Sequence, residues 1–321
     1  MNMKLPRALL LAALLSASAM AHAAYPDRPI HMVVPFSAGG SNDIVARLVG
    51  QQITDALGQP VVTENRPGAS GTIGVNAVAK SVGDGYTLLT SSGTPIAASP
   101  YLYKKLPYDP AMDFAPIIRI ASQPAVLMVK SSLPAANVKE LIALAKKSPG
   151  KLTFGSGGVG STEHMAAVRF MMLTGVEMTH VPYKGGAPAM TDLIGGQVDM
   201  MFATAPSAMP YIKSDKLRTL GVTTLKRSPL LAGVPTISEA GVDGYESVTW
   251  IGLFAPAALP GDVVRKLNGL VQKALGGDLN KKLGELGLDA AGGSPEEFAA
   301  FIRKDSKNYE AVIKAAKITP Q

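Results

Sequence analysis

Residues 154–169 read FGSGGVGSTEHMAAVR, a stretch that predicts a strand, a glycine-serine turn and a helix in succession. The glycines between positions 155 and 160 allow a tight turn in which a ligand can approach the backbone closely. Ser161 or Thr162 can cap the helix that follows. The inward face of that helix is expected to carry apolar residues: Met165, Val168, Met171 and Met172. Because the turn and the helix dipole both favour a negative charge, the stretch predicts an anion site.

The same arrangement occurs a second time, closer to the N-terminus. Residues 30–35 (IHMVVP) predict a strand, residues 36–41 (FSAGGS) a turn, and residues 42–57 a helix whose apolar residues recur at helical spacing. Gly58 is expected to end this helix. The chain therefore contains two motifs of strand, glycine turn and helix.

Further strands and helices follow both motifs in the same order. The expected elements are strands at 61–63 and 86–90 with a helix at 72–80, and strands at 177–181 and 198–202 with a helix at 187–194. Two βαβαβ units predict an α/β protein of two lobes, with two parallel-type sheets flanked by helices and a cleft between the lobes. In such sheets ligands bind beyond the carboxyl ends of the strands, where both glycine turns lie.

Two extended, apolar segments at 120–130 and 248–256 are expected to cross between the lobes. Two crossings make the first lobe discontinuous. We therefore predict a first lobe of residues 24–123 and 251–321 and a second lobe of residues 124–250. The C-terminal part should contain helices near 261–275 and 278–286, and a final helix that begins at the capping box Ser294-Pro295-Glu296-Glu297.

The first residues are typical of an export signal. Lys4 and Arg7 precede the apolar run 8–17, and the small residues that end at Ala23 suit a signal peptidase. The run is too short to span a membrane. The sequence contains no cysteine, which excludes a disulfide and a lipid anchor on cysteine. We therefore expect a periplasmic protein, secreted through a signal peptide that is cleaved after Ala23.

The charged residues do not indicate a nucleic-acid partner. The formal net charge is +7, but the basic residues are scattered and aromatic residues make up only 6% of the chain. A nucleic-acid groove needs a basic stripe with stacking aromatics, so no such partner is expected. Asp43 and Arg47 are four residues apart on a predicted helix and are expected to form an ion pair.

Residues 155–160 also fit the dinucleotide pattern G-x-G-x-x-G. The acid that would bind the ribose should end the next strand, but that strand ends with His180-Val181-Pro182. A phosphate loop would need a lysine at the position of Ser161. The segment most similar to the nucleophile elbow of a serine hydrolase has Thr72 in place of the last glycine of that motif. We therefore expect no cofactor.

The histidines and methionines do not indicate a metal site. His31, His164 and His180 lack the spacing of zinc ligands, and the methionines of the second lobe are interpreted as core residues. His164 lies three residues after Ser161. We interpret it as a polar residue that faces the ligand or is linked to the helix cap, or as a residue packed in the core. A catalytic base would need a nucleophile and an orienting acid nearby, and the sequence shows no obvious set.

A series of motifs extends over nearly the whole chain. They are YPDRPI (25–30), VPFSAGGSND (34–43), ENRPGA (64–69), FGSGG (154–158), HVPYKG (180–185), VPT (234–236) and WIGL (250–253). Together with the leader, this series resembles the Bug-type extracytoplasmic solute receptors of tripartite tricarboxylate transporter systems. No single motif carries the resemblance, but the series is specific.

The resemblance implies a two-lobed periplasmic binding protein of the type II hinge class that closes on a small organic carboxylate. In this family the loops that match 36–40 and 156–161 contact the ligand carboxylate from opposite lobes, through main-chain amides, hydroxyls and bridging waters. Lys184 is the one cation next to a predicted cleft loop. The expected ligand-binding residues are Phe36, Ser37, Ala38, Gly39, Gly40, Ser91, Ser92, Ser156, Gly157, Gly158, Gly160, Ser161, His164, Tyr183, Lys184 and Ala205.

The function that the resemblance implies is that of a receptor and not of an enzyme. Such a protein delivers its ligand to the permease subunits of a membrane transporter, and we expect it to be a monomer. Family members accept amino acids, di- and tricarboxylates and aromatic carboxylates, and the motifs do not decide among these. Two alternatives stay open: a periplasmic hydrolase or isomerase that uses His164 with Ser161, and a ligand sensor subunit of a signalling system.

Overall fold

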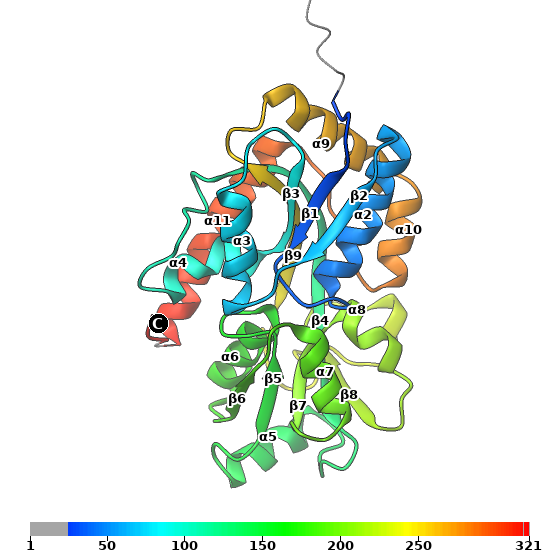
Figure 1. Cartoon of the computed structure of the whole chain (residues 1–321). Coiled ribbons are helices and arrows are strands. Elements are labelled where there is room, and N and C mark those ends of the chain that lie inside the picture. The colour runs from blue at the N-terminus through cyan, green and yellow to red at the C-terminus, as the bar shows by residue number, and fades with distance from the viewer. Residues whose placement is uncertain (1–24, 317, 321) are drawn as a thin grey trace, which may run out of the picture.

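The structure is a computed structural model, and it describes residues 25–316 and 318–320. The predicted signal peptide, with its cleavage after Ala23, lies outside the described residues. Figure 1 shows two α/β lobes, one above the other, with strands β4 (Phe114–Lys130) and β9 (Val248–Pro256) running between elements of both. The predicted two-lobed α/β architecture is confirmed.

The first lobe is built around parallel strands in the order β2, β1, β3. These strands are β1 (Ile30–Val34), β2 (Val61–Asn65) and β3 (Thr87–Ser92). They alternate with helices and short turns: α2 (Ser41–Leu57), η1 (Ala69–Gly71), α3 (Thr72–Ala79), η2 (Thr94–Ala98) and α4 (Ser99–Leu102). The carboxyl ends of β1 and β3 therefore point toward the second lobe.

The second lobe repeats this pattern around β5 (Thr153–Ser156), which pairs in parallel with β6 (Thr179–Pro182) and β7 (Met200–Thr204). The helices of this lobe are α5 (Val138–Lys147), α6 (Thr162–Thr174), α7 (Gly186–Ile194) and α8 (Ala205–Ala208). The remaining elements are η3 (Met209–Tyr211), β8 (Leu217–Val222) and η4 (Pro229–Leu231). Helix α5 is absent from the sequence prediction.

Strand β4 belongs to both lobes. Its residues from Phe114 to Pro124 pair with β9, and its residues from Ala125 to Val129 pair with β7, in both cases antiparallel. Each sheet is therefore mixed, with parallel strands beside the antiparallel connecting strand. The segment 248–256 has the bounds expected of a crossing, whereas β4 begins before the expected residue 120. The boundaries proposed for the lobes stay a prediction.

The C-terminal part of the chain returns to the first lobe. Its elements are α9 (Gly261–Leu275), α10 (Asp278–Glu285), β10 (Asp289–Ala290) and α11 (Pro295–Ala315). The predicted capping box is confirmed: Glu297 N donates to Ser294 Oγ at 3.1 Å, and Ser294 N donates to Glu297 Oε2 at 2.8 Å. The first lobe is thus completed by residues from both ends of the described chain.

Each lobe has its own apolar core. The first core includes Ile30, Val49 and Leu267, and the second includes Phe154 and Phe170, all of them buried. The prediction that Met172 faces inward is wrong, because this side chain is 43% exposed. Phe170 is on the buried face of α6, and two further residues along a helix turn the side chain by about 200°.

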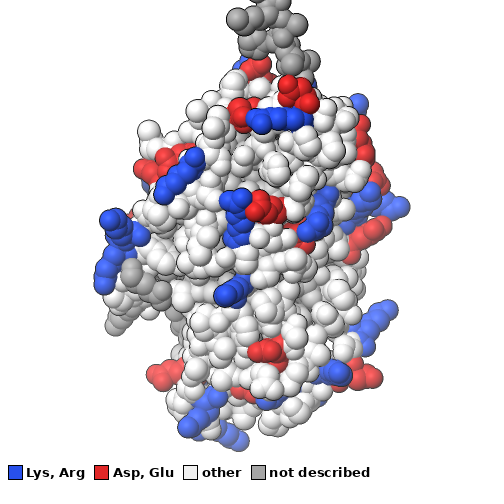
Figure 2. Space-filling model, in the orientation of Figure 1, with Lys and Arg blue, Asp and Glu red and all other residues white. Residues whose placement is uncertain are grey.

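Charged residues of both signs are interspersed on the face shown in Figure 2, without a large block of either sign. Within residues 25–316 and 318–320, no helix is both long and apolar enough to cross a bilayer.

Candidate functional site

A small cavity lies where the two lobes meet, at the carboxyl ends of strands from both. It measures about 20 Å³, the room that one water molecule needs. The lining residues come from both lobes and from the connecting strand: Phe36, Gly40, Ser41, Asn42, Ser92, Gln123, Gly157, Ser161, Thr162, Glu163, Gly186, Thr204 and Ser207. Most of these residues are small or polar, so the cavity is suited to a polar ligand.

The first turns of helices α2, α6 and α7 contribute residues to this lining, namely Ser41 and Asn42, Thr162 and Glu163, and Gly186. The first N–H groups of a helix have no partner within the helix, and the helix dipole favours an anion beside them. Helix α2 begins after Gly40, which has no side chain to cap these groups. Its N-terminus is therefore open toward the cavity.

Two buried amide side chains of the lining have an atom without a partner. Asn42 is 8% exposed and Gln123 is 1% exposed, and neither Asn42 Oδ1 nor Gln123 Oε1 accepts a hydrogen bond. Gln123 Nε2 donates to Ser41 Oγ. Because a buried polar atom without a partner costs free energy, these atoms indicate that the cavity is made to hold something polar.

The glycine turn of the first lobe is fixed by a buried acid. Asp43 Oδ2 accepts from Gly39 N at 3.0 Å, and Asp43 Oδ1 accepts from Asn65 Nδ2 at 3.0 Å. The predicted ion pair is confirmed, with Arg47 Nη2 at 2.9 Å from Asp43 Oδ1. Burial alone would raise the pKa of Asp43, but the hydrogen bonds from Arg47, Gly39 and Asn65 lower it below its ordinary value. The carboxylate of Asp43 is therefore bound within the turn and does not line the cavity.

Two neighbouring imidazoles, tilted 32° to each other, support the glycine turn of the second lobe. Gly160 N donates to His164 Nδ1 at 3.0 Å, and Ser156 Oγ lies 2.5 Å from His180 Nε2. The two ring centroids are 4.2 Å apart. Burial and the neighbouring His180 lower the pKa of His164 to about 3, and burial lowers that of His180 to about 4. Both imidazoles are therefore neutral at ordinary pH.

The position of His164 gives no support to a catalytic pair with Ser161. The Ser161 side chain accepts from the backbone N of His164 at 3.3 Å, as an N-terminal cap of α6. The imidazole accepts a hydrogen bond from Gly160 N. In the described part of the chain, no hydrogen bond joins the ring to Ser161 Oγ. The arrangement orients a turn and does not activate a nucleophile.

Five of the residues predicted to bind the ligand line the cavity, namely Phe36, Gly40, Ser92, Gly157 and Ser161. The others are not part of the lining: Ser37, Ala38, Gly39, Ser91, Ser156, Gly158, Gly160, His164, Tyr183, Lys184 and Ala205. Ser91 is fully buried within β3, and Tyr183 OH donates to Asp192 Oδ2 at 2.7 Å. Lys184 is exposed and contributes its carbonyl oxygen, which accepts from Ser37 Oγ at 2.8 Å.

The sequence prediction missed several lining residues: Ser41, Asn42, Gln123, Thr162, Glu163, Gly186, Thr204 and Ser207. Ser41, Asn42, Thr162 and Glu163 lie in the first turns of helices that follow the two glycine turns, and this position was a usable signal. Gln123 had a weaker signal, as a polar residue within an apolar crossing segment.

Glu163 is the one charged residue of the lining among the described residues. It is 6% exposed and lies in the first turn of α6. Burial raises the pKa of its carboxyl group, while hydrogen bonds from its own N–H, Ser161 and the Gly157 N–H act in the opposite direction. The cavity thus combines an open helix N-terminus in one lobe with an acid in the other.

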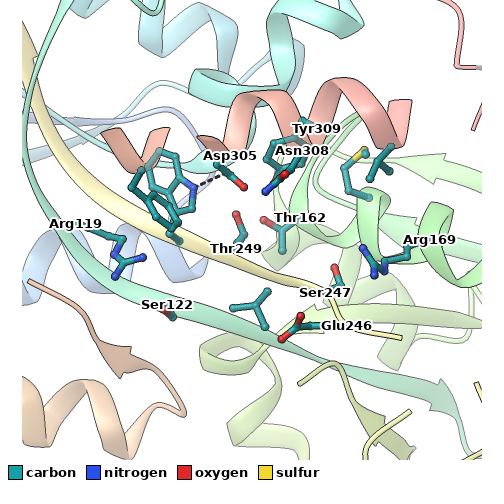
Figure 3. A pocket seen from close by; sticks show the side chains of 15 residues that line it. Arg119, Ser122, Thr162, Arg169, Glu246, Ser247, Thr249, Asp305, Asn308 and Tyr309 are labelled. Carbon is teal, nitrogen blue, oxygen red and sulfur yellow. Dashed lines mark hydrogen bonds between the residues drawn. The ribbon is translucent and has the colours of Figure 1, made fainter. Parts of the chain in front are cut away.

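A larger cavity of about 360 Å³ lies beside the first, between α6, α11 and the connecting strands (Figure 3). Two of its charged groups contact protein groups, whereas Arg169 Nε has no hydrogen-bond partner among the described residues. Asp305 Oδ2 accepts from Trp250 Nε1 at 2.7 Å, and the Arg119 guanidinium lies 4.3 Å from the centre of the Phe301 ring. Thr162 lines both cavities. The smaller cavity, which is lined by the first turns of three helices, is the better candidate for an anion site.

A family model described as "Tripartite tricarboxylate transporter family receptor" matches residues 45–318. The chain is 35% identical over 292 residues to Protein BugT of Bordetella pertussis, an alignment that covers 90% of each chain.

Three solved structures share the fold over nearly their whole length. "R. palustris Rpa4515 with adipate" has a TM-score of 0.90 and 41% identity, covering 92% of this chain and 100% of that one. "Structure of periplasmic binding protein BugD" has a TM-score of 0.89 and 36% identity, with coverage of 92% and 100%. "MatC (Rpa3494) from Rhodopseudomonas palustris with bound malate" has a TM-score of 0.86 and 32% identity, with coverage of 90% and 100%.

Proposed function

The chain belongs to the tripartite tricarboxylate transporter receptor family, and we propose that it captures a small organic carboxylate between its two lobes. The observation that carries this proposal is the cavity at the lobe junction. The open N-terminus of α2 and the first turns of α6 and α7 favour an anion there. Two similar structures whose titles name adipate and malate support a carboxylate as the ligand.

Capture would require the lobes to separate and close again. In this structure they are in contact: Ser37 Oγ donates to Lys184 O at 2.8 Å, and the cavity has room for one water molecule. An organic acid therefore enters only when the lobes are apart. Since each lobe provides part of the lining, the ligand has higher affinity for the closed form and shifts the population toward it.

We propose that the protein acts in the periplasm as a monomer and delivers its ligand to the permease subunits of a membrane transporter. Membership of a transporter receptor family and the likeness to BugD support this role. It releases its ligand chemically unchanged, which agrees with the absence of a Ser161–imidazole bond in the described chain. Delivery can be tested by uptake of labelled ligand in cells with and without this receptor.

The binding function can be tested by titration calorimetry of the secreted protein with adipate, malate and small amino acids. At least one of them should bind and be recovered unchanged by mass spectrometry. Gln123→Leu removes the amide whose Nε2 donates to Ser41 Oγ at the N-terminus of α2, and it should weaken binding by up to about tenfold, since such a hydrogen bond contributes about 0.5–1.5 kcal/mol.

The matched control is Asn308→Leu, which changes an exposed amide of the larger cavity and should leave affinity unchanged. Loss of binding in Asn308→Leu but not in Gln123→Leu would place the ligand in the larger cavity. Binding of none of these acids, or conversion of one into a product, would contradict the proposed receptor function.

A further inference from the structure

The small cavity contains an acid and no basic residue among the residues that the structure describes. This is unexpected for a site that receives a carboxylate, because two like charges in a water-poor space repel each other. The acid is Glu163, whose side chain is almost fully buried. A ligand that binds here must therefore carry a group that compensates the negative charge of Glu163.

The backbone around Glu163 leaves space for its carboxylate. A Cβ atom at Gly186 would lie 2.9 Å from Glu163 Oε1, and one at Gly157 would lie 3.3 Å from Glu163 Oε2. Side chains at these two positions would therefore displace or crowd the acid. The N-termini of α6 and α7 meet at this point, so their dipoles already have an anion beside them.

Helix α2 also begins without a capping side chain, as α7 does, but it belongs to the first lobe. Its first-turn residues Ser41 and Asn42 line the cavity from the first lobe, opposite Glu163 of the second. The acid of this first turn, Asp43, is paired with Arg47, so a ligand carboxylate there does not meet an uncompensated negative charge. The lobe 1 side of the cavity is thus suited to the negative end of a ligand, and the Glu163 side to a positive or donating end.

Gln123 of the connecting strand provides a second acceptor for a donating group. Its Oε1 atom has no hydrogen-bond partner in the described chain although the residue is 1% exposed. A ligand with two carboxylates would bring a second negative charge toward Glu163 with no lining cation to neutralise it. An ammonium group would pair with Glu163 and donate hydrogen bonds to such acceptors.

We propose that Glu163 makes this receptor selective for a zwitterion, an amino acid whose carboxylate binds at the N-terminus of α2 and whose ammonium group pairs with Glu163. This inference rests on the proposed function and specifies the class of ligand. Burial of Glu163 without a cation raises the pKa of its carboxyl group, and a bound ammonium group reverses that effect.

The experiment compares acids that differ in the ammonium group alone. The probes are L-alanine with propionate, L-aspartate with succinate, and 4-aminobutyrate with butyrate, each measured by calorimetry on the secreted protein. In the wild type, at least one amino acid should bind about tenfold or more tightly than its partner without nitrogen, a difference of about 1.4 kcal/mol. Glu163→Gln should reduce this ratio to near one.

Two further variants make the result specific. Glu163→Asp keeps the charge and should keep the amino acid preferred, although by a smaller ratio. Glu246→Gln makes the same change at an exposed residue of the larger cavity and should leave the ratio at its wild-type value. Thermal melting of each variant shows whether it is folded.

Three results would overturn the inference. They are equal binding of both members of every pair, tighter binding of an acid without nitrogen, and an unchanged ratio in Glu163→Gln. In each of these cases a carboxylate still binds, so the proposed function stands. If neither member of any pair binds, the proposed function fails and the inference fails with it.

Discussion

The hydroxyl group of Ser37 donates a hydrogen bond of 2.8 Å to the carbonyl oxygen of Lys184, and this bond joins the glycine turn of the first lobe to the β6–α7 turn of the second. Both turns follow strands that end at the lobe junction. Ser37 therefore contacts the opposite lobe at the rim of the cavity, while Gly40 of the same turn lines the cavity itself. The turn that contains Ser37 and Gly40 thus contributes both to the contact between the lobes and to the lining of the cavity.

Ser37→Ala removes this bond and should shift the population toward separated lobes. A single hydrogen bond of this kind contributes about 0.5–1.5 kcal/mol, so ligand affinity should fall by less than about tenfold. Ser81→Ala is the matched control, because Ser81 Oγ donates to Ala77 O at 2.8 Å within one lobe. It should leave affinity unchanged.

Lobe separation can be measured directly because the chain contains no cysteine. Cysteines introduced at the exposed Lys80 of the first lobe and Lys146 of the second would carry a pair of spin labels. The ligand-free protein should show a broader and longer distance distribution than the liganded one, and Ser37→Ala should broaden it further. A distribution that does not change with saturating ligand would contradict closure.

The buried imidazoles predict a loss of stability in acid. The pKa of His164 is about 3 and that of His180 about 4, below the ~6.5 of an exposed imidazole. Below pH ~6.5 the unfolded chain binds protons that the folded chain does not, so the free energy of unfolding decreases as the pH falls toward 4 and then 3. For His164 this loss is on the order of 2 kcal/mol at pH 5.

Denaturant unfolding at pH 7.5 and pH 5 measures this loss. His164→Gln retains an acceptor for Gly160 N and removes the titrating group, so its stability should depend less on pH over this interval. The same difference between pH 7.5 and pH 5 in wild type and variant would show that His164 does not contribute.

The sequence predicted those parts of the fold that local chemistry determines. The glycine turns after β1 and β5 and the capping box at Ser294 start helices where they were expected. Helix α5 was missed although Asn137 caps it by accepting from Glu140 N at 2.9 Å. The first part of β4 was missed because Pro116 is unusual within a strand, and the register of β4 shifts directly after this proline.

The site was less predictable than the fold, because its residues are brought together by pairing between distant strands. Gln123 lies on β4, and its distance from Ser41 follows from the position of that strand between the lobes. Glu163 carried no distinct signal, since an acid in the first turn of a helix is expected for its interaction with the dipole alone. Its burial at the lobe junction becomes visible only in three dimensions.

Gly186→Ala should move the Glu163 side chain without removing its charge. The new Cβ would lie 2.9 Å from Glu163 Oε1, at the end of a flexible side chain that can shift. Stability should change by less than about 1 kcal/mol, while the ratio of affinities for 4-aminobutyrate and butyrate decreases. Gly195→Ala is the control at the other end of α7, where the nearest atom is 3.4 Å away. Equal ratios in both variants would indicate that the position of Glu163 is unimportant.

Gly160→Ala should interfere with closure more than with folding. Gly160 has a φ of +78°, and a Cβ at this position would collide with Leu102 Cδ1 of the first lobe. Gly175 has a φ of +66° and open space around its Cβ position, so Gly175→Ala imposes similar backbone strain without this contact. Both variants should lose about 1 kcal/mol of unfolding free energy from the left-handed conformation. Gly160→Ala alone should also bind its carboxylate more weakly, because Leu102 and the new methyl group cannot come together when the lobes close. If calorimetry and melting show the same affinity and stability for both variants, then the contact between Gly160 and Leu102 does not limit closure, and the lobes approach each other less closely in solution than they do here.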